Sequence, residues 1–218
     1  MNTSQNHRFG RLVGGLIAAW FVGVVSASAL SIFKEGPVPA GAAAFSPIVV
    51  FLVWFGASPA FRQFILSLDV RILTALQSWR VAGFTFVVAA AYGILPKAFA
   101  LPAGWGDLAI GLTAPLVAHY LAKPGHKLSF IAWQTAGILD LAMAVTLGVL
   151  ASPRIQVLGN GLTTEPLTVL PLSVIPTFAV PVVVIFHIIC IARAGHLEVT
   201  SGVTLRGRET TQPLPQAR

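Results

Sequence analysis

Charged residues are scarce in this 218-residue chain: Asp, Glu, Lys and Arg make up only 10% of it, against a hydrophobic fraction of 56%. A soluble domain usually carries about 25% charged residues, because they cover its water-facing surface. A soluble enzyme, a disordered protein and a secreted disulfide scaffold therefore do not fit. The mean hydropathy of +0.81 instead indicates a polytopic membrane protein.

Cysteine and acidic residues are also rare. The chain has a single cysteine, Cys190, which lies inside an apolar run. One cysteine excludes an intrachain disulfide and a Cys-rich zinc or iron–sulfur site. The net charge of +7 would suggest nucleic acid as the partner of a soluble protein. Here the basic residues are spread between apolar runs rather than along one stripe. The sequence therefore predicts a lipid bilayer as the partner, and no nucleic acid.

Long apolar runs dominate the chain. A helix that spans a membrane needs about 20 mostly apolar residues. Six runs are candidates: Leu12–Phe33, Ser46–Ala60, Leu73–Leu95, Trp105–Ala122, Leu128–Leu150 and Leu167–Ile191. The predicted fold is an all-α, polytopic transmembrane helical bundle of six spans. It forms a single domain over residues 1–193, followed by a polar, disordered cytoplasmic tail over residues 194–218.

The basic residues orient this bundle. Most of the 14 lysines and arginines lie in alternate connecting segments and at the two ends of the chain. The remaining segments contain only Lys34, Lys97 and Arg154. Since Lys and Arg concentrate in cytoplasmic loops, both termini are predicted to be cytoplasmic. The same bias suits a bacterial cytoplasmic (inner) membrane.

The first apolar run has two interpretations. Basic residues before it and small residues after it imitate a cleavable signal peptide. However, small residues recur every four positions along one face of this run, at Gly15, Ala19, Gly23 and Ala27. Such a face lets another membrane helix approach closely. We therefore expect a retained span that docks a partner helix or a second copy of the chain.

A short amphipathic helix is predicted between the second and third runs. Apolar residues follow helical spacing there, at Phe61, Phe64, Ile65, Leu68 and Ile72. Polar residues fill the other face, as in a helix that lies in the membrane interface.

Asp140 is the strongest candidate for a functional residue. An ionisable side chain within a span costs about 3 kcal/mol and is a functional candidate by default. Asp140 lies about 18 Å from the cytoplasmic start of the fifth run, and Trp133 and small residues share its face. Arg80, about 10 Å into the third run, is the predicted partner, with Gln77 one turn before it. A purely structural ion pair, and an Arg80 that extends to the headgroups, are the alternatives.

Asp107 has a predominantly structural interpretation. It follows a Gly-rich segment and opens the fourth run, so we expect it to cap that helix. Alternatively, its carboxylate lies at the top of a groove that leads into the bundle.

Prolines predict a break in the last span. They recur every five residues at Pro166, Pro171, Pro176 and Pro181, which favours an irregular outer half and a regular helix over Thr177–Ile191. Broken helices of this kind recur at transporter binding sites. Three Pro- and Gly-rich segments, Glu35–Ala44, Pro96–Gly104 and Ser152–Pro166, are predicted to be outer loops.

The histidines suggest a different chemistry. His187 and His119 lie at similar depths in different spans, so they could hold a b-type haem. None of the histidines shows metal-ligand spacing, so no metal site and no resident cofactor are predicted, with haem kept as the alternative.

Three functional hypotheses follow. The first is a small-solute or proton-coupled carrier whose substrate- or proton-handling residues are Asp140, Arg80, Asp107, Gln77 and Trp133. The second is an accessory or assembly subunit of a larger membrane complex, and the third is a membrane redox protein that binds b-type haem. An enzyme is not favoured, since Gly-x-Ser-x-Gly, His-Glu-x-x-His and phosphate-loop patterns are absent from the sequence.

Overall fold

The computed structural model describes residues 3–158 and 160–209, and helix is the only regular secondary structure in that part of the chain. The elements are α1 (Thr3–Ala29), η1 (Ile32–Glu35), α2 (Pro37–Ala57), α3 (Pro59–Leu66), α4 (Val70–Ala75), η2 (Leu76–Gly83), α5 (Phe84–Ala91), α6 (Lys97–Tyr120), α7 (Lys127–Leu150), η3 (Glu165–Thr168), η4 (Ile175–Ala179) and α8 (Val180–Glu209). The prediction of an all-α fold is thus confirmed.

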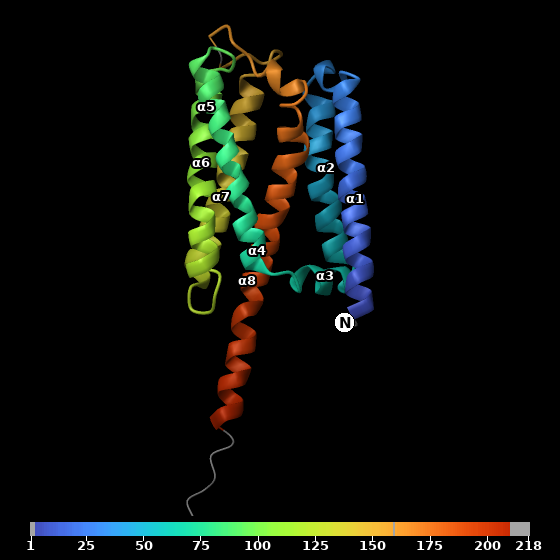
Figure 1. Ribbon diagram of the computed structural model, residues 1–218, viewed down its shortest axis with the longest axis vertical. Coiled ribbons are helices and arrows are strands. Elements are labelled where there is room, and N and C mark those ends of the chain that lie inside the picture. Colours follow the sequence, from blue (N-terminus) through green and yellow to red (C-terminus); the bar gives the residue numbers. More distant parts are fainter. Residues whose placement is uncertain (1–2, 159, 210–218) are drawn as a thin grey trace, which may run out of the picture.

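Six helical segments of the described chain are long and apolar enough to cross a membrane, as predicted. They are His7–Ala29, Pro37–Ala57, Val70–Ala91, Lys97–Tyr120, Lys127–Leu150 and Ile175–Gly195. These segments stand upright side by side, and the α3 connection lies across one end (Figure 1). That end is the predicted cytoplasmic one. The side of the membrane that it faces stays a prediction.

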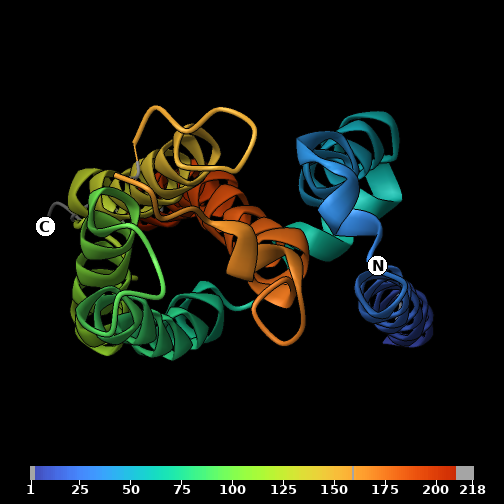
Figure 2. The same ribbon diagram turned by 90° about the horizontal axis from the view of Figure 1, so that it is seen from above.

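The last span occupies the middle of the molecule. Seen from above, α8 lies between a group formed by α4 to α7 and a second group formed by α1, α2 and α3 (Figure 2). It packs against α7 and α4 on one side and against α2 on the other. Residues of the last span can therefore reach side chains from both groups.

Two of the three segments predicted as outer loops, Glu35–Ala44 and Pro96–Gly104, are mostly helical, so these two predictions were wrong. The described residues of the third, Ser152–Pro166, form turns up to the short η3 helix. Pro37 begins α2, and Pro96 immediately precedes α6. Proline is tolerated in the first turn of a helix because the backbone N–H that it lacks would have no partner there. The second and fourth spans therefore start earlier than the apolar runs alone suggested.

The break in the last span is present. A π-helical turn, η4, precedes the regular helix that starts at Val180. Polar side chains provide hydrogen bonds around the break: the Thr177 hydroxyl donates to the Ser173 carbonyl over 2.6 Å, and the Ser173 and Ser28 hydroxyls are 2.6 Å apart. At its other end α8 continues to Glu209, so the described part of the predicted disordered tail is helical. Residues 210–218 lie outside the described residues.

The predicted amphipathic helix is shorter than expected. It ends at Leu66, because Asp69 starts a new helix by accepting a hydrogen bond from the Arg71 N–H over 2.8 Å. Ile72 consequently belongs to the third span and is exposed. Phe61 on α3 is buried and stacks on Trp54, with 3.9 Å between the ring centroids. The location of α3 in a membrane interface stays a prediction.

The small-residue face of α1 has no neighbour within the described chain over much of its length. Gly15, Ala19 and Gly23 are exposed, and Ala27 is half-buried. A Cβ atom added at Gly15 or Gly23 would meet nothing within 4 Å. Docking of a partner helix on this face remains a proposal.

Candidate functional site

Arg80 is the centre of a buried polar cluster that joins four spans. It lies in η2, the 3₁₀ segment of the third span, and its side chain is only 2% exposed. Its Nε donates to Asp107 Oδ1 on α6 over 2.7 Å, and its Nη2 donates to Asp140 Oδ2 on α7. A 3₁₀ stretch of this length within a span is unusual and often marks a functional or strained segment. The structure thus brings together Arg80 and Asp140 and adds a second carboxylate.

Asp107 does not cap a helix, so its predicted role was wrong. Because α6 begins at Lys97, Asp107 lies about 15 Å inside the helix. Its carboxylate faces Arg80, and its side chain is 16% exposed. The alternative interpretation, a carboxylate facing a groove into the bundle, agrees with the cavities described below.

The guanidinium of Arg80 is shared between two carboxylates. Its Nε–H and Nη2–H lie on one edge and commonly hold both oxygens of a single carboxylate. Here each N–H goes to a different one. Asp107 Oδ2 and Asp140 Oδ1 therefore receive no hydrogen bond from the described part of the protein. Ionised, the two carboxylates and Arg80 carry one excess negative charge.

The remaining nitrogen of Arg80 fixes the state of His187 on α8. Nη1 lies 3.4 Å from His187 Nε2, and an arginine can only donate. His187 Nε2 must therefore accept, so the neutral ring carries its proton on Nδ1. Nδ1 donates to Gln134 Oε1 over 2.5 Å, and Gln134 Nε2 donates to Thr74 Oγ1 over 3.1 Å. This Thr74–Gln134–His187 chain extends the cluster toward the predicted cytoplasmic end.

Glycines provide the space for the polar side chains. Gly106 faces the Asp140 carboxylate, Gly83 faces Asp107, and Gly137 faces the His187 ring. A Cβ atom at any of these positions would overlap the opposing side chain. Since protein interiors are packed almost without voids, these side chains occupy the volume that a larger residue would need.

Gln77 and Trp133 lie beside the cluster rather than inside it. Gln77 is fully buried, and its Nε2 is 3.5 Å from the Val183 carbonyl. Its Oε1 has no hydrogen-bond partner among the described residues. Trp133 donates to Thr113 Oγ1 over 3.0 Å, and its ring centroid is 5.8 Å from that of His187. Neither residue shows a polar contact to a carboxylate of the cluster.

Two residues of the cluster, Gln134 and Thr74, were not predicted from the sequence. Both are fully buried. The available signal was weak, because an uncharged amide or hydroxyl within an apolar run is much less costly than a charge. Gln134 is nevertheless the only amide side chain in the fifth apolar run.

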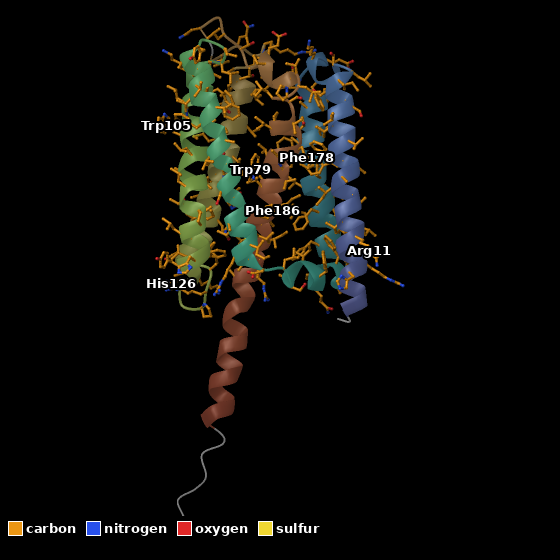
Figure 3. The ribbon with its side chains drawn as sticks, viewed as in Figure 1. Arg11, Trp79, Trp105, His126, Phe178 and Phe186 are labelled. Atoms are coloured by element: carbon orange, nitrogen blue, oxygen red, sulfur yellow. The ribbon has the colours of Figure 1, made fainter. Side chains whose placement is uncertain are left out.

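The structure does not bring together the two histidines considered as haem ligands. His119 is exposed near the end of α6, with its ring against that of Tyr120. His187 is fully buried, and both of its nitrogens contact protein side chains. A further histidine, His126, lies in the turn that connects α6 to α7 (Figure 3).

We accordingly expect no haem spectrum from the purified protein. The absorbance of the full chain in mild detergent should be featureless in the visible range, before and after dithionite. His187 has no free nitrogen for an iron ion in this arrangement. A Soret band that shifts on reduction, and that disappears in His187→Ala, would contradict this expectation.

Two cavities reach the cluster through Asp107. The larger, of about 340 Å³, extends from the predicted outer end, where Lys34, Arg154 and Glu165 line it, down to Asp107. It occupies the space between α2 and α7. The smaller, of about 200 Å³, lies beside Arg80 and Asp107, between η2 and the break in the last span. The cluster is therefore buried but reachable from the predicted outer end.

The fold and site define a class: a helical protein with six described segments long and apolar enough to cross a membrane, four of which contribute side chains to a charged cluster. Residues 38–194 match the family described as a domain of unknown function (DUF8737), and the chain belongs to this family. No curated protein matches the chain, and no solved structure does so. The matched region contains every residue of the charged cluster, whereas α1 precedes it.

Proposed function

We propose that this protein is a proton-coupled carrier of a small solute in a bacterial cytoplasmic membrane. Asp107 and Asp140 would bind the proton, and Arg80 would hold the two carboxylates together. The observation that carries this proposal is the imbalance of the cluster: one guanidinium serves two carboxylates, and the third neighbour is a neutral His187.

The depth of the cluster makes this imbalance costly. Two unit charges 4 Å apart interact by about 4 kcal/mol at an effective dielectric constant of about 20. An unbalanced carboxylate in a span is thus stabilised by a proton or by a cationic solute. Because either one neutralises the same excess charge, the binding of one opposes the binding of the other. Such competition at a single site supports exchange of a solute for a proton.

The polar contacts support access from one side at a time. The larger cavity reaches Asp107 from the predicted outer end. Toward the other end, the Thr74–Gln134–His187 chain fills the interior. This chain offers no simple proton route past Arg80, because a guanidinium stays protonated in proteins. Exposure of the site to the other side would require movement, and η2 and the π-turn are the irregular segments where a span can bend.

An untargeted transport assay tests the proposal. Proteoliposomes would be loaded with a bacterial metabolite extract, placed under a pH gradient and analysed by mass spectrometry of their contents. The wild type should move at least one solute in a gradient-dependent manner. Asp140→Asn should abolish this movement, because the amide can still accept from Arg80 Nη2 but cannot bind a proton.

Asp69→Asn is the matched control for this assay. Asp69 caps α4 outside the cluster, and asparagine caps helices equally well. The control should therefore behave like the wild type. A wild type that moves no solute, or an Asp140→Asn variant that moves the same solute equally well, would contradict the proposal.

A further inference from the structure

We infer that the solute is a monovalent organic cation with an apolar body, bound in the larger cavity against Asp107. This inference rests on the proposed function and adds a substrate class to it.

The walls of the cavity fit an apolar body. Aromatic rings from four elements line it, at Phe33, Phe45, Phe86 and Phe99. Aliphatic side chains of α7 cover much of the opposite wall, among them Leu141, Ala144 and Val145. A volume of about 340 Å³ lies within the range of small-molecule sites, which are mostly apolar with a few placed polar groups. Aromatic faces also attract cations.

The deep end of the cavity supplies the countercharge. Asp107 lines it there, and only one of its oxygens is held by Arg80. The charged or titratable groups around Asp107 are Arg80 on η2, Asp140 on α7 and the neutral His187 on α8. Together they leave one negative charge, which a single positive charge balances. An anion would double the imbalance, and a small inorganic cation would find too few oxygen ligands among apolar walls.

At the predicted outer end, the rim of the cavity does not favour a solute of one charge. Lys34, Arg154 and Glu165 give its rim both signs, and the Arg154 guanidinium donates to the Glu35 carbonyl. The helices on the two sides, α2 and α7, pack against other elements: α2 against α8 and the π-turn, α7 against α6 and α8. A molecule with an apolar body can thus occupy the space between them with its charge at Asp107.

The inference can be tested by calorimetry, which measures the binding of tetraphenylphosphonium to the purified full chain in detergent. We expect saturable binding that releases protons into a weakly buffered solution and weakens on acidification. Asp107→Asn should weaken it by about tenfold or more, since the Coulomb attraction between two nearby unit charges at an effective dielectric constant of about 20 exceeds the free energy of one tenfold step in Kd. Asp69→Asn, the same chemical change at a helix cap outside the cavity, should leave the Kd unchanged.

Two further measurements separate specific binding from partition into apolar surface. Tetraphenylborate has the same shape and the opposite charge, and should not bind. Ala144→Phe narrows the cavity without removing a charge from the cluster, and should abolish binding of the cation even if Asp107→Asn fails to fold. Equal binding of the two ions, or unchanged binding in Ala144→Phe, would overturn the inference.

The outcomes also distinguish this inference from the proposed function. Absence of binding to the wild type would overturn the cation site, while gradient-dependent movement of another solute would keep the carrier. Specific binding of the cation without movement of any solute in proteoliposomes would support the site and contradict the carrier.

Discussion

Replacement of Arg80 by glutamine is expected to lower the free energy of unfolding by about 3–5 kcal/mol, the usual cost of removing one partner from a buried ion pair. Glutamine can still donate a hydrogen bond, but it leaves Asp107 and Asp140 facing each other without a cation. The yield of monodisperse protein should be lower for the variant than for the wild type, and its Tm in detergent should also be lower. Tryptophan fluorescence during heating and size-exclusion chromatography would measure both effects.

Charge balance makes this prediction specific. Either single change, Asp107→Asn or Asp140→Asn, leaves one cation against one anion and should preserve the fold. The triple variant R80Q/D107N/D140N contains no charge in the cluster, so it should regain most of the stability lost in Arg80→Gln. Arg11→Gln is the control, because Arg11 is exposed and points away from the helices (Figure 3). A triple variant as unstable as Arg80→Gln would rule out charge imbalance as the cause.

Gly106→Ala is expected to have the second large effect. The added methyl group would occupy the position of the Asp140 carboxylate, so α6 and α7 must separate or the carboxylate must leave Arg80. Overpacking of this kind typically costs about 1–3 kcal/mol. Loss of the ion pair would add to that cost. The measurement is again the Tm in detergent, together with the transport assay.

A compensating pair tests the proposed contact. In an Asp140→Ala background the carboxylate is gone, so Gly106→Ala should have little further effect, and the two changes should be strongly non-additive. Gly14→Ala is the matched control, since a Cβ atom at Gly14 meets nothing within 4 Å. Equal destabilisation by Gly106→Ala in the wild type and in Asp140→Ala would contradict the contact.

The Arg80–Asp140 pair was accessible to prediction because charges within the apolar runs are few. An acidic side chain near the middle of one span has to find a cation, and Arg80 was the candidate at the nearest depth. The break in the last span followed in the same way, since four regularly spaced prolines cannot all fit into one α-helix. In both cases a local feature of the sequence has a large energetic cost, and that cost restricts the structure.

The predicted capping role of Asp107 was wrong because the apolar composition of the run does not reveal where its helix begins. The fourth apolar run begins beside Asp107, whereas α6 begins at Lys97. Pro96 and Pro102 indicate a loop when they are considered by themselves. In the structure Pro96 precedes α6 and Pro102 lies inside it. Nothing in the local sequence distinguishes these arrangements. Because α6 begins before Asp107, this residue is a partly buried partner of Arg80 within the helix and not a cap.

The polar chain and the glycines were inaccessible for a different reason. The contacts of Gln134 and Gly137 with His187 depend on which face of α7 packs against α8. In the structure the His187 ring fills the space beside Gly137. For His187 the sequence suggests a haem ligand, whereas the structure places it beside Arg80. Contacts between spans depend on register, which hydrophobic periodicity alone does not determine.

Infrared difference spectroscopy of the carboxyl groups would test the excess charge most directly. Spectra of the wild type would be compared between alkaline and acidic samples, over the pH range in which the protein stays folded. We expect a carboxylic acid C=O band to appear on acidification, to disappear when tetraphenylphosphonium is added, and to be absent from both Asp107→Asn and Asp140→Asn. A wild-type spectrum without such a band, or the same band in both variants, would contradict a proton-binding cluster.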